Sequence, residues 1–240
     1  MKQNRKIALL TGATRGIGKA IALILVKNNY DLFIVGRNLE ALERTKVDLE
    51  SHGGSCAYMA ADLSLSDTAE AVVEAAVREY GRLDVVINNA GLANSMPIAD
   101  TSVEMWNDIF AVNARTPFFI CKAAIPHLKV SDKPVIINIA SVVAFKGYTN
   151  QGVYASSKHA LAGFTKVLAK EVQADGTQVH MISPGGVNTE MVQEMRPDID
   201  TEQLIQPDEI AELVEFILTR KGKGTIDHFY IRRQSGLAFD

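Results

Sequence analysis

Cysteine is scarce in this chain of 240 residues. The two that occur, Cys56 and Cys121, form no CxxC pair, and the five histidines show no metal-ligand spacing. Neither a disulfide framework nor a metal site is therefore predicted. Two free thiols suit a reducing compartment, so a cytoplasmic location is expected.

Long apolar runs and an excess of one charge are also missing. No apolar run approaches the roughly 20 residues that span a bilayer, and the run that follows the basic start MKQNRK ends at Leu10, too early for a signal peptide. Lysine and arginine number 25 against 28 acids, a net charge of −3, which argues against a broad nucleic-acid surface. The chain contains no GxSxG elbow, so a serine hydrolase is unsupported. We expect no membrane and no nucleic-acid partner.

Short apolar runs alternate with helical patterns from end to end. Runs rich in Val and Ile predict buried strands at 6–10, 31–35, 55–60, 83–88, 134–140 and 177–183. Residues 225–231 are a candidate last strand. Helical patterns lie between them near 16–28, 39–51, 67–80, 102–128, 152–174 and 207–219. This alternation predicts an α/β fold with one doubly wound, mostly parallel sheet of the Rossmann type and helices on both faces. With no repeat or Pro/Gly-rich linker, residues 1–240 are expected to form a single domain.

The first strand runs into TGATRGIGKAIA at 11–22. Gly12, Gly16 and Gly18 would stand at a strand-to-helix turn, where the missing Cβ atoms let a pyrophosphate approach the backbone. The helix that follows offers unpaired N–H groups to phosphates. Glycines also serve ordinary turns, but this position after the first strand favours a dinucleotide site.

Two arginines indicate which dinucleotide is bound. A site selecting NAD usually places an acid about 20 residues beyond the glycines, to hold the ribose 2′-hydroxyl. Here that place holds Gly36 followed by Arg37, and Arg15 stands inside the glycine loop. Guanidinium groups bind a 2′-phosphate, whereas an acid would repel it. NADP(H) is therefore predicted over NAD(H).

Further motifs match one family. Asp62 lies in AADLS, NNAG spans 88–91, SPGGVNT spans 183–189, and Tyr154 precedes Lys158 by one helical turn. With TGATRGIG, these make the chain resemble a short-chain dehydrogenase/reductase of the single-domain type, from residue 7 to about 191. The resemblance implies a catalytic set of Asn113, Ser141, Tyr154 and Lys158. It implies a cofactor site formed by Gly12, Thr14, Arg15, Gly16, Ile17, Gly18, Arg37, Asp62, Leu63, Asn89, Ala90, Gly91, Tyr154, Lys158, Pro184, Gly185, Val187 and Thr189.

The same resemblance implies a mechanism, in which Tyr154 gives a proton to a carbonyl oxygen while NADPH delivers hydride to the carbon. An ammonium about 4 Å away contributes on the order of 4 kcal/mol at an effective dielectric near 20, enough to bring a phenol pKa from about 10 towards neutrality. Lys158, together with the positive nicotinamide ring, is expected to do this. Ser141 would orient the substrate oxygen, and Asn113 would hold a water that links Lys158 to solvent.

The substrate class stays open between two choices. Reductases of 3-oxoacyl-acyl carrier protein share the glycine loop, and Gln151 resembles a pocket residue common among them. However, Asp132 and Asp175 stand where those enzymes typically carry arginines, and carboxylates would repel an acidic carrier. We therefore expect a free ketone or aldehyde with an apolar body. Val143 and Phe145 would extend the apolar pocket wall, with core packing as the equally ordinary alternative for both.

Two different classes of protein are also compatible with parts of the sequence. An epimerase or dehydratase normally has a larger C-terminal region than the roughly 50 residues after Thr189, and a non-catalytic NADP(H)-sensing protein would not need the catalytic set. Residues 188–206, with Met191 and Met195, are expected to form a substrate lid. The C-terminus lacks the V-D-G-G ending of many family members, whose last strand often packs across a subunit interface. Pairing through the helices at 102–128 and 152–174 could still form a dimer, so a homodimer or homotetramer is expected.

Overall fold

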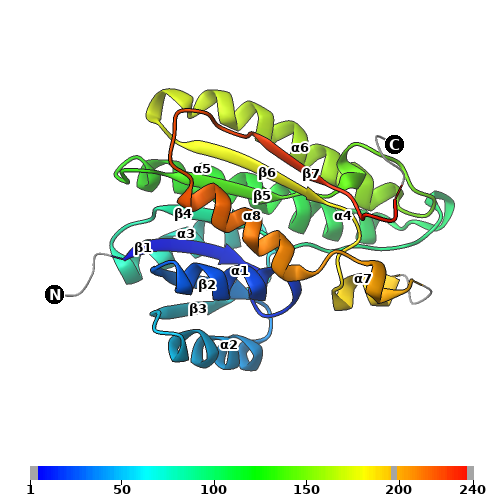
Figure 1. Cartoon of the computed structure of the whole chain (residues 1–240). Coiled ribbons are helices and arrows are strands. Elements are labelled where there is room, and N and C mark those ends of the chain that lie inside the picture. Colours follow the sequence, from blue (N-terminus) through cyan, green and yellow to red (C-terminus); the bar gives the residue numbers. More distant parts are fainter. Residues whose placement is uncertain (1–4, 196–198, 237–240) are drawn as a thin grey trace.

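A parallel sheet of seven strands forms the centre of the molecule (Figure 1). The computed structural model describes residues 5–195 and 199–236. The strand order within these residues is β3-β2-β1-β4-β5-β6-β7. The strands are β1 (Lys6–Thr11), β2 (Tyr30–Gly36), β3 (Cys56–Ala60), β4 (Val85–Asn88), β5 (Val135–Ile139), β6 (Gln178–Pro184) and β7 (His228–Ile231). The predicted fold class, a doubly wound parallel sheet, is confirmed.

Helices cover both faces of the sheet (Figure 1). The α-helices are α1 (Gly16–Lys27), α2 (Leu39–Ser51), α3 (Thr68–Tyr80), α4 (Val103–Phe110), α5 (Thr116–Leu128), α6 (Gly152–Glu171), α7 (Glu190–Met195) and α8 (Pro207–Thr219). Short helical turns lie between these elements: the 3₁₀ turns η1 (Ile98–Asp100), η3 (Val142–Ala144), η4 (Gln173–Asp175) and η5 (Thr201–Gln203), and the π-helical turn η2 (Ala111–Arg115). Among the described residues, none of these helices combines the length and the apolar character that crossing a membrane requires.

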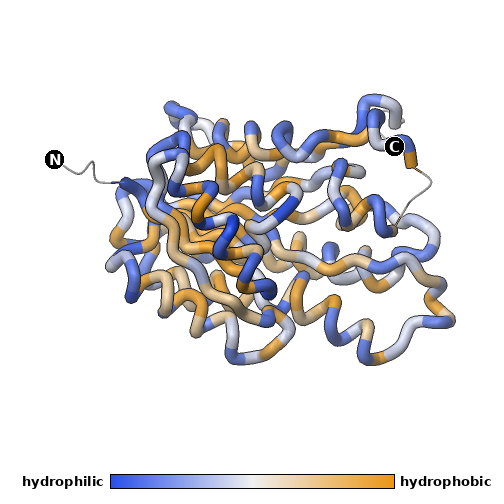
Figure 2. The backbone as a smooth tube through the Cα atoms, turned by 90° about the horizontal axis from the view of Figure 1, so that it is seen from below, coloured by the Kyte–Doolittle hydropathy of each residue, from blue (hydrophilic) through white to orange (hydrophobic). Residues whose placement is uncertain are grey.

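The central strands are apolar on both sides because both sides are covered, whereas the edge strands β3 and β7 are only partly buried. On one face, alternate residues such as Leu10 and Ile34 pack against α1, α2 and α8. On the other face, Leu9 and Val86 pack against α3 and α5. In Figure 2 the hydrophobic segments run through the interior of the molecule, and hydrophilic segments lie mostly at the turns on its outside. This two-sided burial explains why the strands read as continuous Val/Ile-rich runs.

The sheet reverses its winding between β1 and β4. β1 pairs with β2 on one side and with β4 on the other, so the loops that follow these strands diverge. A crevice opens at the carboxyl ends of the strands at such a switch point, and ligands of open α/β sheets bind there. The glycine loop, the NNAG motif and Ser141 all follow strands at this edge.

One predicted helix is interrupted. Instead of a continuous helix over 102–128, α4 and α5 are separated by a π-helical turn, η2. The wider turn inserts an extra residue and re-aims the side chains within it, and such turns often occur at functional sites. Asn113, which the sequence singled out, lies in this turn and is fully buried.

Candidate active site

A cavity of about 570 Å³ lies at the carboxyl edge of the sheet. It is bordered by the loops after β1, β2, β3, β4, β5 and β6 and by α6 and α7. Every residue predicted for the cofactor site lines it, and so do Ser141, Tyr154 and Lys158. Asn113 does not. The sequence-predicted set is thus brought together in one place, with Asn113 directly behind it.

The glycine loop is too tightly packed for side chains. Gly12 and Gly16 have positive φ angles of 69° and 51°. A Cβ atom on Gly18 would lie 2.0 Å from the Gly12 carbonyl oxygen, and one on Gly12 would lie 2.9 Å from the Ala90 Cα. The backbone therefore forms this wall of the cavity, as the approach of a pyrophosphate requires.

The NNAG segment holds the glycine loop in place. Asn89 Nδ2 donates to the Thr11 and Gly12 carbonyl oxygens, both at 3.0 Å. In return, the Thr11 hydroxyl accepts from the Asn89 and Ala90 backbone N–H groups at 3.1 Å. These bonds fix the ends of β1 and β4 against each other across the switch point.

A second chain of amides positions α6. Asn88 Nδ2 donates to Asn138 Oδ1 at 2.8 Å, and Asn138 Nδ2 donates to the Thr165 hydroxyl at 2.8 Å. These bonds join β4, β5 and the helix that carries Tyr154 and Lys158, so Asn88 holds neighbouring strands together. The two donated amide hydrogen bonds join these three elements, while Asn88 Oδ1 itself has no hydrogen-bond partner among the described residues.

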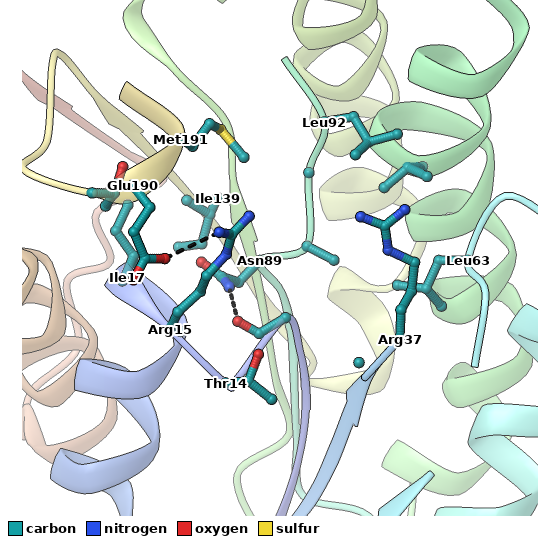
Figure 3. Close-up of a pocket in the computed structure, with 18 of the residues that line it drawn as sticks. Thr14, Arg15, Ile17, Arg37, Leu63, Asn89, Leu92, Ile139, Glu190 and Met191 are labelled. Atoms are coloured by element: carbon teal, nitrogen blue, oxygen red, sulfur yellow. Dashed lines mark hydrogen bonds and ion pairs between the residues drawn. The ribbon is translucent and has the colours of Figure 1, made fainter. Parts of the chain in front are cut away.

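Arg37 points into the cavity from the end of β2 (Figure 3). Asp62 lies on the same side of the cavity, where the Ser64 backbone N–H donates to its Oδ1 at 2.8 Å. This hydrogen bond lowers the pKa of the Asp62 carboxyl, and the charge of Arg37 acts in the same direction. The Asp62 side chain is therefore an ionised acceptor at neutral pH.

Arg15 lies on the opposite side of the opening and is already paired (Figure 3). Its Nη1 is 3.1 Å from Glu190 Oε2 and 3.9 Å from Glu194 Oε1, both on α7. Arg37, by contrast, has no carboxylate within 4.0 Å among residues 5–195 and 199–236. The two arginines thus differ in their surroundings, a difference that the sequence does not show.

The Tyr154 phenol and the Ser141 hydroxyl meet at the inner part of the cavity. Ser141 follows β5, donates to the Pro184 carbonyl oxygen at 3.4 Å and accepts from the Val143 N–H at 3.4 Å. Burial raises the pKa of the Tyr154 phenol, and the hydrogen bond to Ser141 opposes that rise. Desolvation by the chain's own residues therefore acts against the predicted lowering of the phenol pKa, which also invoked the positive nicotinamide ring of the cofactor.

Lys158 is buried beside Tyr154. Its side chain is 3% exposed, and Nζ donates to the Ile139 carbonyl oxygen at 2.9 Å. Nζ lies 5.9 Å from the centre of the Tyr154 ring. Burial lowers the pKa of Lys158 to about 8. The ammonium is thus held under the ring by a backbone carbonyl, which explains why it does little to acidify the phenol.

Asn113 is engaged by the protein itself. Its Oδ1 accepts from the Leu92 N–H at 2.7 Å, while Nδ2 donates to the Leu92 carbonyl at 2.7 Å and to the Ser157 hydroxyl at 3.0 Å. These bonds tie the π-helical turn to the loop after β4 and to α6. The water-holding role implied by the family resemblance stays a prediction, and the structure gives Asn113 a positioning role in addition.

The segment predicted as a lid begins at the cavity. Thr189 lines it, and its methyl group would lie 2.9 Å from a Cβ placed on Gly16. A bridge between Val187 and Ile205, with Asn188 N donating to Ile205 O at 2.8 Å, fixes both ends of the segment. Met191 lines the cavity; residues 196–198 of the predicted lid lie outside the described residues.

Several residues that line the cavity were not singled out from the sequence, and two residues considered for its wall do not line it. Glu190, Val192, Leu92, Val112 and Asp108 border the cavity. Glu190 directly follows a recognised motif, so its position was the available signal. For Val143 and Phe145 the sequence left pocket wall and core packing open. Neither residue lines this cavity: Val143 is buried, and the Phe145 ring packs 4.8 Å from the His228 ring.

Comparison with known proteins agrees with this geometry. The family model for short chain dehydrogenases matches residues 6–200. This chain belongs to the short-chain dehydrogenase family. Within the part that the structure describes, no cluster of His, Cys, Asp and Glu is arranged to hold a metal. A member of this family is an oxidoreductase that uses a nicotinamide dinucleotide, and the side-chain-free glycine cradle fits that cofactor.

Relatives of this chain include family members that are named for different substrates. The chain is 32% identical to a 3-oxoacyl-[acyl-carrier-protein] reductase of Chlamydia muridarum, over 90% of this chain and 91% of that protein. It is 30% identical to a cyclohexanol dehydrogenase of Acinetobacter, over 91% and 89%. The alcohol dehydrogenase of the archaeon Thermococcus sibiricus, solved with 5-hydroxy-NADP, superposes with a TM-score of 0.89 at 27% identity, over 99% and 100%.

Proposed function

We propose that this short-chain dehydrogenase reduces a free ketone or aldehyde to an alcohol with NADPH. The observation that carries the proposal is one cavity lined by Tyr154, Ser141 and Lys158 and also by Arg15 and Arg37. The two arginines lie on opposite sides of its opening (Figure 3). Tyr154, Ser141 and Lys158 can hydrogen-bond and protonate a carbonyl oxygen. The guanidinium groups of the two arginines can bind a phosphate.

Tyr154 is assigned the role of proton donor. Reduction requires the phenol to carry its proton when the carbonyl oxygen gains negative charge, and the raised pKa of Tyr154 keeps that proton in place at neutral pH. Ser141, which hydrogen-bonds the phenol, would orient the same carbonyl oxygen. Lys158 holds positive charge below the ring and would contact the ribose of the cofactor. Bound NADPH would supply the hydride.

Arg37 and Arg15 are assigned to the 2′-phosphate. Both are cavity-lining cations, and Gly36 leaves no carboxylate at the end of β2 to select the ribose hydroxyl of NAD. The Thermococcus sibiricus structure was solved with an NADP derivative, which supports this choice. The remaining cofactor contacts are assigned to the glycine loop, to Asp62 and to residues 89–91 and 184–189.

The substrate assignment rests on the apolar part of the cavity. Leu92, Val112, Ile139, Met191 and Val192 all line it, which favours an apolar body. Repulsion of an acidic carrier is weaker than the sequence suggested, because Asp175 Oδ2 lies 3.0 Å from Lys129 Nζ and its charge is compensated. The similarity to a carrier-protein reductase therefore makes that thioester the necessary comparison substrate.

The test is a steady-state comparison of NADPH and NADH consumption with free ketones, aldehydes and a 3-oxoacyl carrier-protein thioester. We expect NADPH to be preferred in kcat/KM by at least about tenfold, or about 1.4 kcal/mol. Equal values for both cofactors would contradict the assignment of the arginines. A carrier thioester that wins by orders of magnitude would replace the proposed substrate class, and tight NADPH binding without turnover on any carbonyl would indicate a binding protein.

A further inference from the structure

Among the described residues, Glu190 is the one cavity-lining carboxylate that pairs with an arginine assigned to the cofactor phosphate. It opens α7, directly after Thr189, and its Oε2 lies 3.1 Å from Arg15 Nη1 (Figure 3). Both side chains are more than half exposed, at 57% for Glu190 and 55% for Arg15. An exposed ion pair is weak enough for a better anion to displace it.

A 2′-phosphate near Arg15 would be such an anion. A phosphate carries more charge than a carboxylate and offers several acceptor oxygens to the guanidinium fork. It cannot share Arg15 with Glu190 without bringing two negative groups together, and like charges at short range repel. Binding of the phosphate and pairing of Glu190 therefore oppose each other.

We propose that Glu190 tunes cofactor preference by competing with the 2′-phosphate of NADP(H) for Arg15, so that occupation of the phosphate site releases α7 from the glycine loop. This inference rests on the proposed use of NADPH. Arg37 lies on the other side of the opening and has no carboxylate within 4.0 Å in the described part of the chain, so it remains available throughout. Arg37 would then anchor the phosphate, and Arg15 would leave the glutamates of α7 when it binds the same phosphate.

The local structure allows α7 to respond. The bridge between Val187 and Ile205 fixes the ends of the segment, while α7 itself is tied to the glycine loop by the pairs of Arg15 with Glu190 and Glu194. Both glutamates lie on α7, so losing Arg15 would remove both ion pairs at once. Met191, between them, lines the cavity and would move with the helix.

The experiment measures binding of NADP⁺ and NAD⁺ by isothermal titration calorimetry to the wild-type chain and to Glu190→Gln. Removing the competitor is expected to tighten NADP⁺ binding about two- to fivefold, the range typical of exposed ion pairs, and to leave NAD⁺ binding unchanged. The gain should shrink as salt is added, because exposed charges are screened. Glu212→Gln is the control, since Glu212 is an exposed glutamate of α8 that does not line the cavity.

An Arg15→Ala background separates competition from general repulsion. Competition predicts that the gain from Glu190→Gln disappears when Arg15 is absent. A gain that persists in that background, equal gains for both cofactors, or no gain at all would overturn the inference. If Arg15→Ala by itself fails to weaken NADP⁺ selectively, the assignment of Arg15 in the proposed function is wrong as well.

Hydrogen exchange supplies a second readout. Amides of α7 are expected to exchange faster in Glu190→Gln than in the wild-type chain without ligand, and NADP⁺ should accelerate α7 exchange in the wild type only. Slower or unchanged exchange on adding NADP⁺ to the wild type would show that α7 is not released, and would overturn that part of the inference.

Discussion

Replacing Lys158 with methionine is expected to stabilise the protein while removing its proposed activity. Lys158 is 3% exposed, and burial lowers its pKa from 10.5 to about 8. A difference of about 2.5 pKa units, at about 1.4 kcal/mol each, means that the charged lysine costs the folded state about 3 kcal/mol at pH 7. Losing the hydrogen bond to the Ile139 carbonyl returns about 1 kcal/mol, so a net gain of about 2 kcal/mol is expected.

The pH dependence gives this prediction its sign. The folded-state pKa lies below the unfolded one, so between about pH 8 and 10.5 the unfolded chain holds a lysine proton that the folded chain has released. Raising the pH through this window favours the folded wild-type protein, and the advantage of Lys158→Met should shrink by up to about 1.4 kcal/mol per pH unit. Below about pH 8 the advantage should be constant.

The assay is urea unfolding of both proteins at several pH values between 7 and 10, with turnover and NADPH binding measured alongside. Lys170→Met serves as the control, because Lys170 lies near the end of the same helix, away from the cavity, and should change the free energy of unfolding by less than about 0.5 kcal/mol. A methionine variant that is less stable than wild type at pH 7, or whose advantage does not change with pH, would refute the reasoning from burial.

Single substitutions at Tyr154, Arg37 and Asp84 test the site and the core separately. Tyr154→Phe should lower kcat at least about a hundredfold, yet leave the Kd for NADPH nearly unchanged by calorimetry, because only the proton donor is lost. Arg37→Asp should shift the ratio of kcat/KM for NADPH and NADH towards NADH by about tenfold or more, since a charged hydrogen bond is replaced by repulsion; an unchanged ratio would remove Arg37 from the phosphate site. Asp84→Ala should cost about 3–5 kcal/mol in denaturant unfolding, because the fully buried carboxylate accepts from Ile7 N at 2.8 Å and pairs with Arg82. The lowered pKa of Asp84 means that its contribution is present above the unfolded value and is lost as pH falls through the folded value, so the variant's deficit should narrow in acid.

The parallel sheet, the glycine loop and the spacing of Tyr154 and Lys158 could be predicted from the residues alone. These features are local: a buried strand needs a continuous apolar run, a crowded turn needs glycine, and residues one helical turn apart share a face. The strand at 6–10 and the helix at 39–51 appear within one residue of their predicted bounds. The sequence also placed the cavity-lining motifs after successive strands, which is enough to gather them at one edge of a parallel sheet.

The contacts that those side chains make depend on elements distant in the chain and could not be predicted. The π-helical turn at Ala111–Arg115 interrupts an otherwise regular helical pattern, and it places Asn113 against Leu92 and Ser157. The raised pKa of Tyr154 and the lowered pKa of Lys158 follow from burial by several elements, which overrides the pairwise attraction that the spacing suggested. Arg15 and Glu190 are far apart in the chain, and their contact exists because α7 returns over the glycine loop. The hydrophobic pattern predicts which face of a helix or strand is buried. Desolvation and ion pairing depend on which distant elements pack against that face.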